Sequence, residues 1–250
     1  MNLEELTVIA KNAAIEAGKI IFSIYRSDDL GIDFKEDDSP LTKADIAAHE
    51  VIVRHLRDTG LPVLSEEGSF TPYLIRSQWE YYWLIDPLDG TKEFLNKNGE
   101  FTVNIALIHG QKSILGVVYA PVLDWLYWGN EKDGAWKQVE DKTPKRMKAK
   151  ANGPVKTLVA SRSHMTEETL RFIEQYPNAE IINMGSSLKF MLVAEDKAQC
   201  YPRFAPTMEW DTAASQAIVE AAGRQVLTYP EMKPMKYNRE EMRNGWFLVR

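Results

Sequence analysis

Residues 81–102 read YYWLIDPLDGTKEFLNKNGEFT, and this stretch decides the fold. It opens on an apolar run, Tyr81–Ile85, and reaches a proline and then a glycine within the next five residues. An apolar run of this length that ends at such residues predicts a buried strand followed by a turn. Pro87 restricts the backbone and Gly90 permits it to reverse, so side chains within the turn can converge.

The turn carries Asp86 and Asp89, with the carbonyl group of Leu88 between them. Turns at strand ends are common positions for functional residues. Two carboxylates and a carbonyl form a set of oxygen ligands that suits a hard cation such as Mg²⁺. Taken alone, the pattern also fits a solvated acidic turn.

Composition indicates an ordinary globular protein that contains no transmembrane helix. The 250 residues are 44% hydrophobic and 26% charged, enough for one large domain or two small ones. No apolar run approaches the roughly 20 residues that span a bilayer, and Lys11 interrupts the N-terminal segment too early for a signal peptide. The single cysteine, Cys200, excludes an internal disulfide and favours a cytoplasmic location. A net charge of -6 argues against a nucleic-acid partner.

The N-terminal part predicts two amphipathic helices. Apolar residues at three- and four-residue spacing cover residues 3–25, and a second such pattern follows Thr42 and ends at Gly60. Residues 27–39 are polar and predict a loop or a weak hairpin. Thr42 and Asp45 have the spacing of a helix-capping pair, so helix initiation alone explains both residues.

The middle of the chain predicts a sheet. A short strand, 62–65, runs into Glu66 and Glu67, which again fit either a solvated turn or a site. Alternating segments separated by turn residues then predict strands at 101–108, 114–119, 125–128 and 135–139. Residues 142–150 (KTPKRMKAK) are basic without apolar periodicity, which predicts a linker between an N-terminal α+β subdomain (1–150) and a C-terminal α/β subdomain (151–250).

The second half predicts alternating strands and helices, hence a layered α/β arrangement. Strands are expected at 158–161, 181–184, 199–204 and around residues 226 and 247. Helices are expected at 167–176, 188–198 and 210–222. Asp211 stands where the last helix begins, so it has a structural role as a capping residue beside any other role.

Acidic residues therefore end or begin elements in four separate segments. They are Asp45, Glu66, Asp86 with Asp89, and Asp211. Cleavage of a phosphate ester by two or more divalent ions needs about this many carboxylates, because the ions bridge a water and a phosphate.

Three motifs in order resemble the inositol monophosphatase superfamily. They are Glu66-Glu67 after a buried strand, the run DPLDGT at 86–91, and WDTAA at 210–214. Together they are far more specific than any one of them. The resemblance covers nearly the whole chain and implies a metal-dependent phosphatase. The fold it implies is the layered α-β-α-β-α sandwich, of mixed α/β class, shared with fructose-1,6-bisphosphatase.

Further segments resemble the 3'(2'),5'-bisphosphate nucleotidase branch of that superfamily. In chain order they are DSPLT (38–42), DGTKEF (89–94), NGEFTVNIALI (98–108), LGVVYAP (115–121), SRSH (161–164), GSSLKF (185–190) and YPRF (201–204). The resemblance implies hydrolysis of the 3'-phosphate of adenosine 3',5'-bisphosphate (PAP), with its sulfated relative as a second substrate, in sulfur assimilation. Lithium and calcium are then expected to inhibit.

The same resemblance implies residue roles. One Mg²⁺ would be held by Glu66, Asp86 and the Leu88 carbonyl, a second by Asp86, Asp89 and Asp211, and a third, weaker ion by Glu66 through water. Thr91, oriented by Asp45, would polarise the attacking water, and the amides of Gly90 and Thr91 would contact the phosphate. Ser186, Lys189 and Arg203 match the spacing of substrate contacts in nucleotidases, and Ser161 and His164 would contact the ribose or base.

The sequence leaves several alternatives open. Lys189 also fits a surface lysine of a helix, and Arg203 an exposed strand residue. An inositol monophosphatase is the alternative enzyme, and a catalytically silent binding protein on the same fold is the alternative outside enzymes. The oligomeric state and a peripheral contact with the cytoplasmic face of the inner membrane are undecided, and Trp125 and Trp128 fit either a core or an interface.

Overall fold

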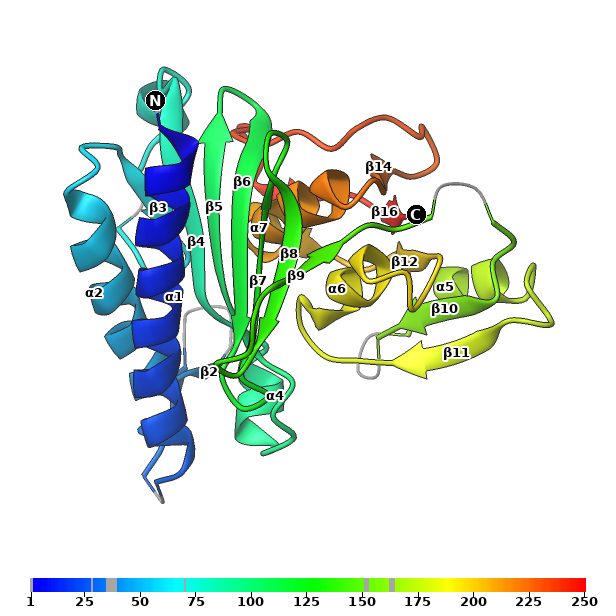
Figure 1. Ribbon diagram of the computed structural model, residues 1–250, viewed down its shortest axis with the longest axis horizontal. Helices are drawn as coiled ribbons and strands as arrows, with labels where there is room; N and C mark the ends of the chain where they lie inside the picture. The colour runs from blue at the N-terminus through cyan, green and yellow to red at the C-terminus, as the bar shows by residue number, and fades with distance from the viewer. Residues whose placement is uncertain (1, 28, 35–39, 70, 151–152, 162–164) are drawn as a thin grey trace.

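A seven-stranded mixed sheet lies at the centre of the structure, a computed structural model (Figure 1). The structure describes residues 2–27, 29–34, 40–69, 71–150, 153–161 and 165–250. The sheet order is β3-β4-β5-β6-β7-β8-β9, with β3 parallel to β4 and every other neighbouring pair antiparallel. Its strands are β3 (Val63–Ser65), β4 (Tyr81–Asp89), β5 (Thr102–His109), β6 (Lys112–Ala120), β7 (Trp125–Asn130), β8 (Gly134–Val139) and β9 (Lys145–Met147).

Both faces of this sheet are covered by helices. α1 (Leu3–Tyr25) and α2 (Lys43–Arg57) lie on one face, and α6 (Leu188–Ala194) and α7 (Glu209–Ala221) on the other (Figure 1). Successive residues of β4 face opposite sides of the sheet. Trp83 and Ile85 pack in a first core together with α1 and α2. Tyr82 and Leu84 pack in a second core together with α6 and α7. Near-continuous apolar sequence in the strands therefore reflects burial on two sides.

A second set of strands lies beyond α6 and α7. β10 (Thr157–Ala160) pairs with β11 (Glu180–Asn183), and β16 (Phe247–Val249) lies between β12 (Tyr201–Arg203) and β14 (Val226–Thr228). A bridge from Leu158 to Cys200 joins the two groups. Leu158 and Cys200 pack with α5 (Glu167–Ile173) on the outside, while Val159 and Tyr201 face the second core. The layers are thus α-β-α-β-α, as the resemblance to the inositol monophosphatase superfamily implies.

Short elements complete the chain. They are β1 (Asp33–Phe34) paired with β2 (Pro40–Leu41), β13 (Thr207–Met208) paired with β15 (Arg243–Asn244), and the helices α3 (Tyr73–Arg76) and α4 (Thr91–Leu95). Only β1 of this pair falls in residues 27–39, where the sequence predicts a loop or a weak hairpin, and residues 28 and 35–39 of that stretch lie outside the described residues.

The predicted linker at 142–150 is wrong, because it contains β9, the edge strand of the central sheet. Met147 and Ala149 are buried, whereas Lys145, Lys148 and Lys150 are exposed. This is the alternation of a strand with one covered face, hidden in the sequence by the number of lysines. Lysines on an edge strand also discourage pairing with another chain.

Other predicted elements are present with different ends. The helix expected at 167–176 stops at Ile173, and the one expected at 188–198 stops at Ala194. The strand expected at 199–204 is limited to Tyr201–Arg203. One core cluster includes Leu84 from the first half and Ile218 from the second, so the halves share a core. A subdomain boundary near residue 150 stays a prediction.

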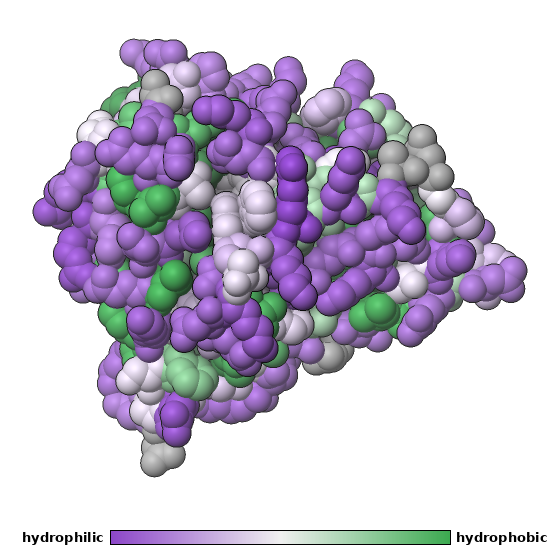
Figure 2. Space-filling model, viewed as in Figure 1, coloured by the Kyte–Doolittle hydropathy of each residue, from purple (hydrophilic) through white to green (hydrophobic). Residues whose placement is uncertain are grey.

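Hydrophilic side chains cover most of the face in Figure 2, and apolar side chains appear there as separate spots. Trp125 and Trp128, which the sequence left between core and interface, are both partly buried against the cores. Lys137 lies over the ring of Trp125 at 3.8 Å and Lys11 over that of Trp128 at 3.7 Å. Within the described residues, no helix combines the length and the apolar character required to cross a membrane.

Candidate active site

The end of β4 brings its carboxylates into an irregular turn. The register with β5 shifts between Asp86 and Asp89, which marks a β-bulge. Oδ1 of Asp86 accepts a hydrogen bond from the backbone N–H of Leu88 at 3.0 Å, which fixes the first carboxylate. Gly90 then takes a left-handed conformation, φ 95°, immediately before α4. A residue with a Cβ is strained in this conformation, so the glycine permits the reversal.

Two other elements place acids beside Asp86. β3 pairs in parallel with β4, so Glu66 leaves its strand next to the end of β4, and its N–H donates to the Ile85 carbonyl at 3.2 Å. Asp211 lies in the first turn of α7, where its Oδ2 accepts from the Met208 N–H at 2.8 Å. The capping role predicted for Asp211 is therefore present, at the third helical position.

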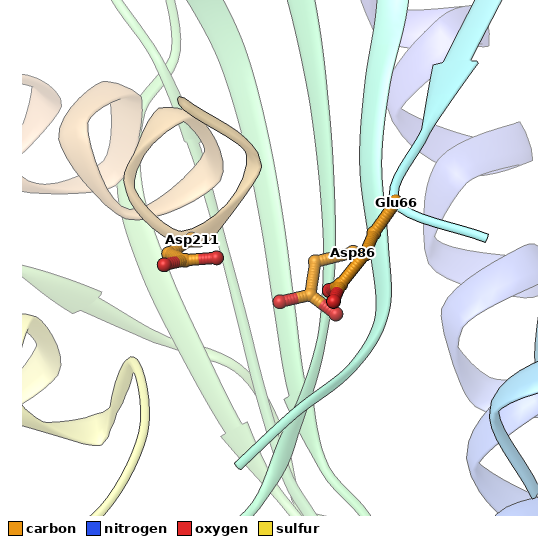
Figure 3. Close-up of side chains that lie close together, drawn as sticks. All are labelled: Glu66, Asp86 and Asp211. Carbon is orange, nitrogen blue, oxygen red and sulfur yellow. The ribbon is translucent and has the colours of Figure 1, made fainter. Parts of the chain in front are cut away.

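Glu66, Asp86 and Asp211 form one cluster. Each offers a carboxylate oxygen, and these oxygens all lie within 4.8 Å of one another. Figure 3 shows Glu66 and Asp86 side by side, with Asp211 facing them from α7. Burial raises the pKa of Asp86 well above its ordinary range, and the charges of Glu66, Asp89 and Asp211 raise it further. Burial likewise raises the pKa of Asp211, followed by the charges of Asp89 and Glu66.

This donor set fits a divalent cation. Three carboxylates held this close repel one another, and a hard cation bound by oxygen ligands removes that repulsion. Leu88, whose carbonyl is the further expected ligand, is buried in the same turn. Mg²⁺ is bound by carboxylates and carbonyls of this kind, so the chemistry of the residues agrees with the expectation from sequence.

Asp89 lies outside this three-residue cluster in the structure. Its Oδ2 accepts from Ser186 Oγ at 2.6 Å and Ser187 Oγ at 2.8 Å, with longer contacts from Asn104 Nδ2 at 3.4 Å and Thr102 Oγ1 at 3.5 Å. The carboxylate is thus held by β5 and by the turn before α6. Its place as a metal ligand remains a prediction.

Asp45 has the capping role that its spacing with Thr42 predicts. Its Oδ2 accepts from the Thr42 N–H at 2.7 Å and from the Thr42 hydroxyl at 2.5 Å, a capping box at the start of α2. Both residues are buried, and the charge of Asp45 contributes to the raised pKa of Asp86. Thr91 is the first residue of α4 and lines the cavity described next. The orientation of Thr91 by Asp45 remains a prediction.

A cavity of about 260 Å³ opens beside the carboxylates. It brings together most of the residues singled out in the sequence: Glu66, Asp89, Gly90, Thr91, Ser161, Ser186, Lys189, Arg203 and Asp211. Asp45, Asp86 and Leu88 are buried and are not among the lining residues. His164 lies outside the described residues.

The cationic side of the cavity contains Lys189 and Arg203. Lys189, at the start of α6, is buried rather than on the surface, and its Nζ donates to the Ser186 carbonyl at 2.5 Å. Burial lowers the pKa of Lys189 to about 8, and the nearby charge of Asp89 acts in the opposite direction. Arg203 is partly buried on β12 and donates from Nη2 to the Pro206 carbonyl at 3.1 Å. The alternative interpretation from sequence, in which Lys189 is a surface lysine and Arg203 an exposed strand residue, therefore does not describe either side chain.

Apart from Ser186, the sequence did not single out the residues that bind Asp89. Thr102 and Asn104 are polar residues in an otherwise apolar strand, and both are buried. Buried polar side chains are normally hydrogen-bonded. Two polar residues inside a strand predicted to be buried therefore indicated that each has a hydrogen-bond partner nearby. Ser187 stood next to the predicted Ser186, and its hydroxyl also lies 3.2 Å from the carbonyl oxygen of Asp211. Glu93, another lining residue, has its pKa raised by burial.

Comparisons with known proteins agree with this geometry. The inositol monophosphatase family matches the chain over residues 2–243, and the chain belongs to this family. Among curated relatives, the 3'(2'),5'-bisphosphate nucleotidase CysQ of Salmonella typhimurium is 46% identical, over 99% of this chain and 98% of the relative. The CysQ of Escherichia coli K12 is 45% identical with the same coverage.

Solved structures give the same result. The crystal structure of CysQ from Bacteroides thetaiotaomicron, a bacterial member of the inositol monophosphatase family, superposes with a TM-score of 0.89. Its identity is 46%, over 99% of this chain and 98% of that one. An inositol monophosphatase from Anabaena, 24% identical, has a TM-score of 0.78 over 100% of this chain and 91% of its own, which shows the shared fold.

Proposed function

We propose that this protein is a Mg²⁺-dependent 3'(2'),5'-bisphosphate nucleotidase that converts PAP to AMP and phosphate. The observation that carries the proposal is a single cavity lined by carboxylates and by two cations, one buried and one partly buried. Glu66, Asp89 and Asp211 line it together with Lys189 and Arg203. A substrate with two phosphates needs both kinds of group, and the full-length relatives named above act on such substrates by name.

In this proposal the acidic residues hold the metal. Glu66, Asp86 and the carbonyl of Leu88 would hold one ion, Asp86, Asp89 and Asp211 would hold a second, and Glu66 would assist a third through water. When bound, Mg²⁺ supplies charge neutralisation at the phosphoryl oxygens and a more acidic water. Because Asp89 already accepts hydrogen bonds from Ser186 and Ser187, its carboxylate is oriented before any ion arrives.

Thr91 and Gly90 contact the reacting phosphate. Gly90 and Thr91 form the turn into α4, and such a turn presents free backbone N–H groups to an anion. Asp45 holds the Thr91 hydroxyl, which accepts a hydrogen bond from the attacking water. The oxygen of that water forms a new bond to phosphorus, and the bond from phosphorus to O3' of the ribose breaks. One proton of the water ends on O3', which leaves as the hydroxyl of AMP, and the other stays with the released phosphate.

Lys189 and Arg203 bind the 5'-phosphate, which is not cleaved. An ammonium and a guanidinium pair strongly with phosphate in a site that excludes water. Ser186 contributes its hydroxyl, and Ser161 and His164 contact the ribose or base. The sulfated relative of PAP keeps the 3'-phosphate and is the second substrate. Clearance of PAP in the cytoplasm during sulfur assimilation is the physiological role we assign.

The test compares two substrates and two variants. We expect kcat/KM for PAP to exceed that for inositol 1-phosphate by about 100-fold at fixed Mg²⁺, roughly 2.7 kcal/mol of transition-state binding. Asp89→Asn should abolish Mg²⁺-dependent phosphate release, whereas Asp58→Asn, at an exposed position after α2, should retain it. Comparable rates on both substrates would support an inositol monophosphatase, and no release from either substrate would support a silent binding protein.

A further inference from the structure

A second cavity, of about 530 Å³, lies on the far side of the second sheet from the active site. Its wall includes Cys200 of β12 and Leu248 of β16, which both face outward toward α5. The neighbouring residue Tyr201 points to the opposite face and lines the active-site cavity. The two cavities are therefore separate and lie on opposite faces of β12. Figure 1 shows β12 and β16 near α5 and the C-terminal end.

The charge of this second cavity is positive. Arg224 and Arg250 are the charged side chains among the described residues that line it. Both guanidinium charges lower the pKa of the Cys200 thiol, although burial raises it overall to about 12. Both arginines therefore lie near the same wall. Asp196 lies outside the lining residues and pairs with Arg224, so one net positive charge remains at this wall, which favours an anionic ligand.

Arg224 is held in place before a ligand binds. Its side chain is 8% exposed, and its Nη2 donates to Asp196 Oδ1 at 2.5 Å. Its Nε has no acceptor among the described residues, so the guanidinium is only partly satisfied. The backbone of Arg250 exchanges hydrogen bonds of 2.9 and 2.7 Å with Gln225, and its side chain is exposed. The held guanidinium of Arg224 reduces the entropy lost on binding.

Aromatic rings and amides form the rest of the wall. Phe172 and Tyr176 lie with their ring centroids 5.5 Å apart, and Phe172 and Tyr229 6.0 Å apart. Stacking of a nucleobase on an aromatic side chain contributes about 1–3 kcal/mol. The amide side chains of Gln175 and Gln225 offer both donors and acceptors to the edge of a base.

We infer that this cavity is a second binding site, which takes a nucleoside monophosphate. Arg224 and Arg250 bind its phosphate, and the base lies against the rings of Phe172, Tyr176 and Tyr229. The volume falls within the roughly 300–1,000 Å³ of small-molecule sites. The inference does not depend on the reaction proposed above.

The experiment removes both proposed sets of phosphate contacts in the active site from the measurement. Equilibrium dialysis with labelled AMP uses the full chain carrying Lys189→Ala and Arg203→Ala, with EDTA in place of Mg²⁺. We expect one AMP to remain bound per chain. Gln225→Glu places a negative charge at an exposed wall position and should weaken that binding at least about tenfold. The matched variant Gln225→Lys should not weaken it, and Arg224→Gln should weaken it as Gln225→Glu does.

Adenosine and inorganic phosphate test the two halves of the ligand. Each should bind at least about tenfold more weakly than AMP, because each lacks one of the two contacts. Loss of all AMP binding in the double variant would overturn the inference, and so would AMP binding that Gln225→Glu leaves unchanged. Inorganic phosphate binding as tightly as AMP would also overturn it, since the rings would then contribute nothing. None of these results bears on hydrolysis of PAP by the wild-type chain.

Discussion

The hydroxyl of Ser187 lies 2.8 Å from Oδ2 of Asp89, although 98 residues separate them in the sequence. The contact joins the turn before α6 to the end of β4, and Ser187 also lies 3.2 Å from the carbonyl oxygen of Asp211. One buried side chain thus connects the two sides of the active site. We infer that the turn at residues 185–187 orients Asp89 for its proposed role as a ligand.

Ser187→Ala should therefore weaken the metal site. A hydrogen bond to a charged group contributes about 1.5–3 kcal/mol, so we expect kcat/KM for PAP to fall about 10- to 100-fold. The concentration of Mg²⁺ needed for half-maximal rate should rise in parallel, which phosphate release over a Mg²⁺ titration will measure. Ser77→Ala, at an exposed serine after α3, is the control. An unchanged Mg²⁺ titration would show that Ser187 does not position Asp89.

Lys189→Ala should separate the two substrates. Lys189 is proposed to bind the phosphate that is not cleaved, a group that inositol 1-phosphate lacks. We expect kcat/KM for PAP to fall by about 100-fold, and that for inositol 1-phosphate by less than about threefold.

Lys148→Ala removes an exposed lysine beyond β9 and should leave both substrates unaffected. Because Lys189 also donates to the Ser186 carbonyl, Arg203→Ala provides a second variant that leaves this bond intact. An equal loss on both substrates in both variants would argue against the assigned phosphate contact.

The pH dependence of kcat/KM for PAP should show that Lys189 must be positively charged to bind the substrate. Burial lowers its pKa to about 8 in the substrate-free protein, so the ammonium loses its proton as the pH rises through that value. The neutral amine cannot pair with phosphate. We expect kcat/KM for PAP to fall above pH 8, by up to about tenfold per pH unit, since this ratio reports the free enzyme.

Lys189→Arg keeps a positive charge at every accessible pH. Its profile should stay level above pH 8, even if its absolute rate is lower. A fall of the same size in this variant would assign the titration to another group.

These predictions rest on parts of the molecule that the sequence revealed to different degrees. Asp86, Glu66 and Asp211 could be singled out because each stands at an element end, but only the resemblance to the inositol monophosphatase superfamily implied that they share one site. That Asp89 is held by Thr102, Asn104 and the turn at 185–187 was not predictable. These contacts depend on how β5 and α6 pack in three dimensions, which hydrophobic periodicity does not contain.

The edge strand β9 shows a second limit of structure prediction from the sequence. Its apolar signal consists of Met147 and Ala149 among lysines, and only the pairing of β9 with β8 makes that alternation meaningful. The long helices, by contrast, follow from repeated apolar spacing. Helix α5 ends at Ile173, earlier than its apolar pattern suggests, since helix ends depend on local caps and contacts.

Asp86→Asn should stabilise the metal-free protein while it removes activity. The folded-state pKa of Asp86 lies above its ordinary value near 3.8, so the folded state binds more protons than the unfolded state. Stability in EDTA should then fall as the pH rises from about 4 through the raised pKa. Replacing the buried charge relieves the repulsion, and each 1 kcal/mol relieved should raise the Tm by about 2–4 °C.

Thermal melting at several pH values, with EDTA or with Mg²⁺, will check this. Saturating Mg²⁺ should raise the Tm of the wild type and flatten its pH dependence, and should do neither for Asp86→Asn. A wild-type Tm that is indifferent to Mg²⁺ would contradict the proposed site.

Gly116→Ala should affect the metal site from within the sheet. Gly116 lies on β6 directly beneath α7, and a Cβ added there would come within 2.0 Å of the Ala214 carbonyl oxygen. Ala214 is one turn beyond Asp211, so α7 must move for the methyl group to fit. Overpacking of this kind costs about 1–3 kcal/mol, and displacement of Asp211 should raise the Mg²⁺ requirement of the reaction.

Gly245→Ala is the matched control, because an added Cβ there meets no atom within 4 Å. It should leave both the Tm and the Mg²⁺ titration unchanged. If Gly116→Ala lowers the Tm but leaves the Mg²⁺ titration normal, the added methyl group displaces β6 and leaves α7 in place. The position of α7 would then be insensitive to β6, and the close approach at Gly116 would serve packing alone.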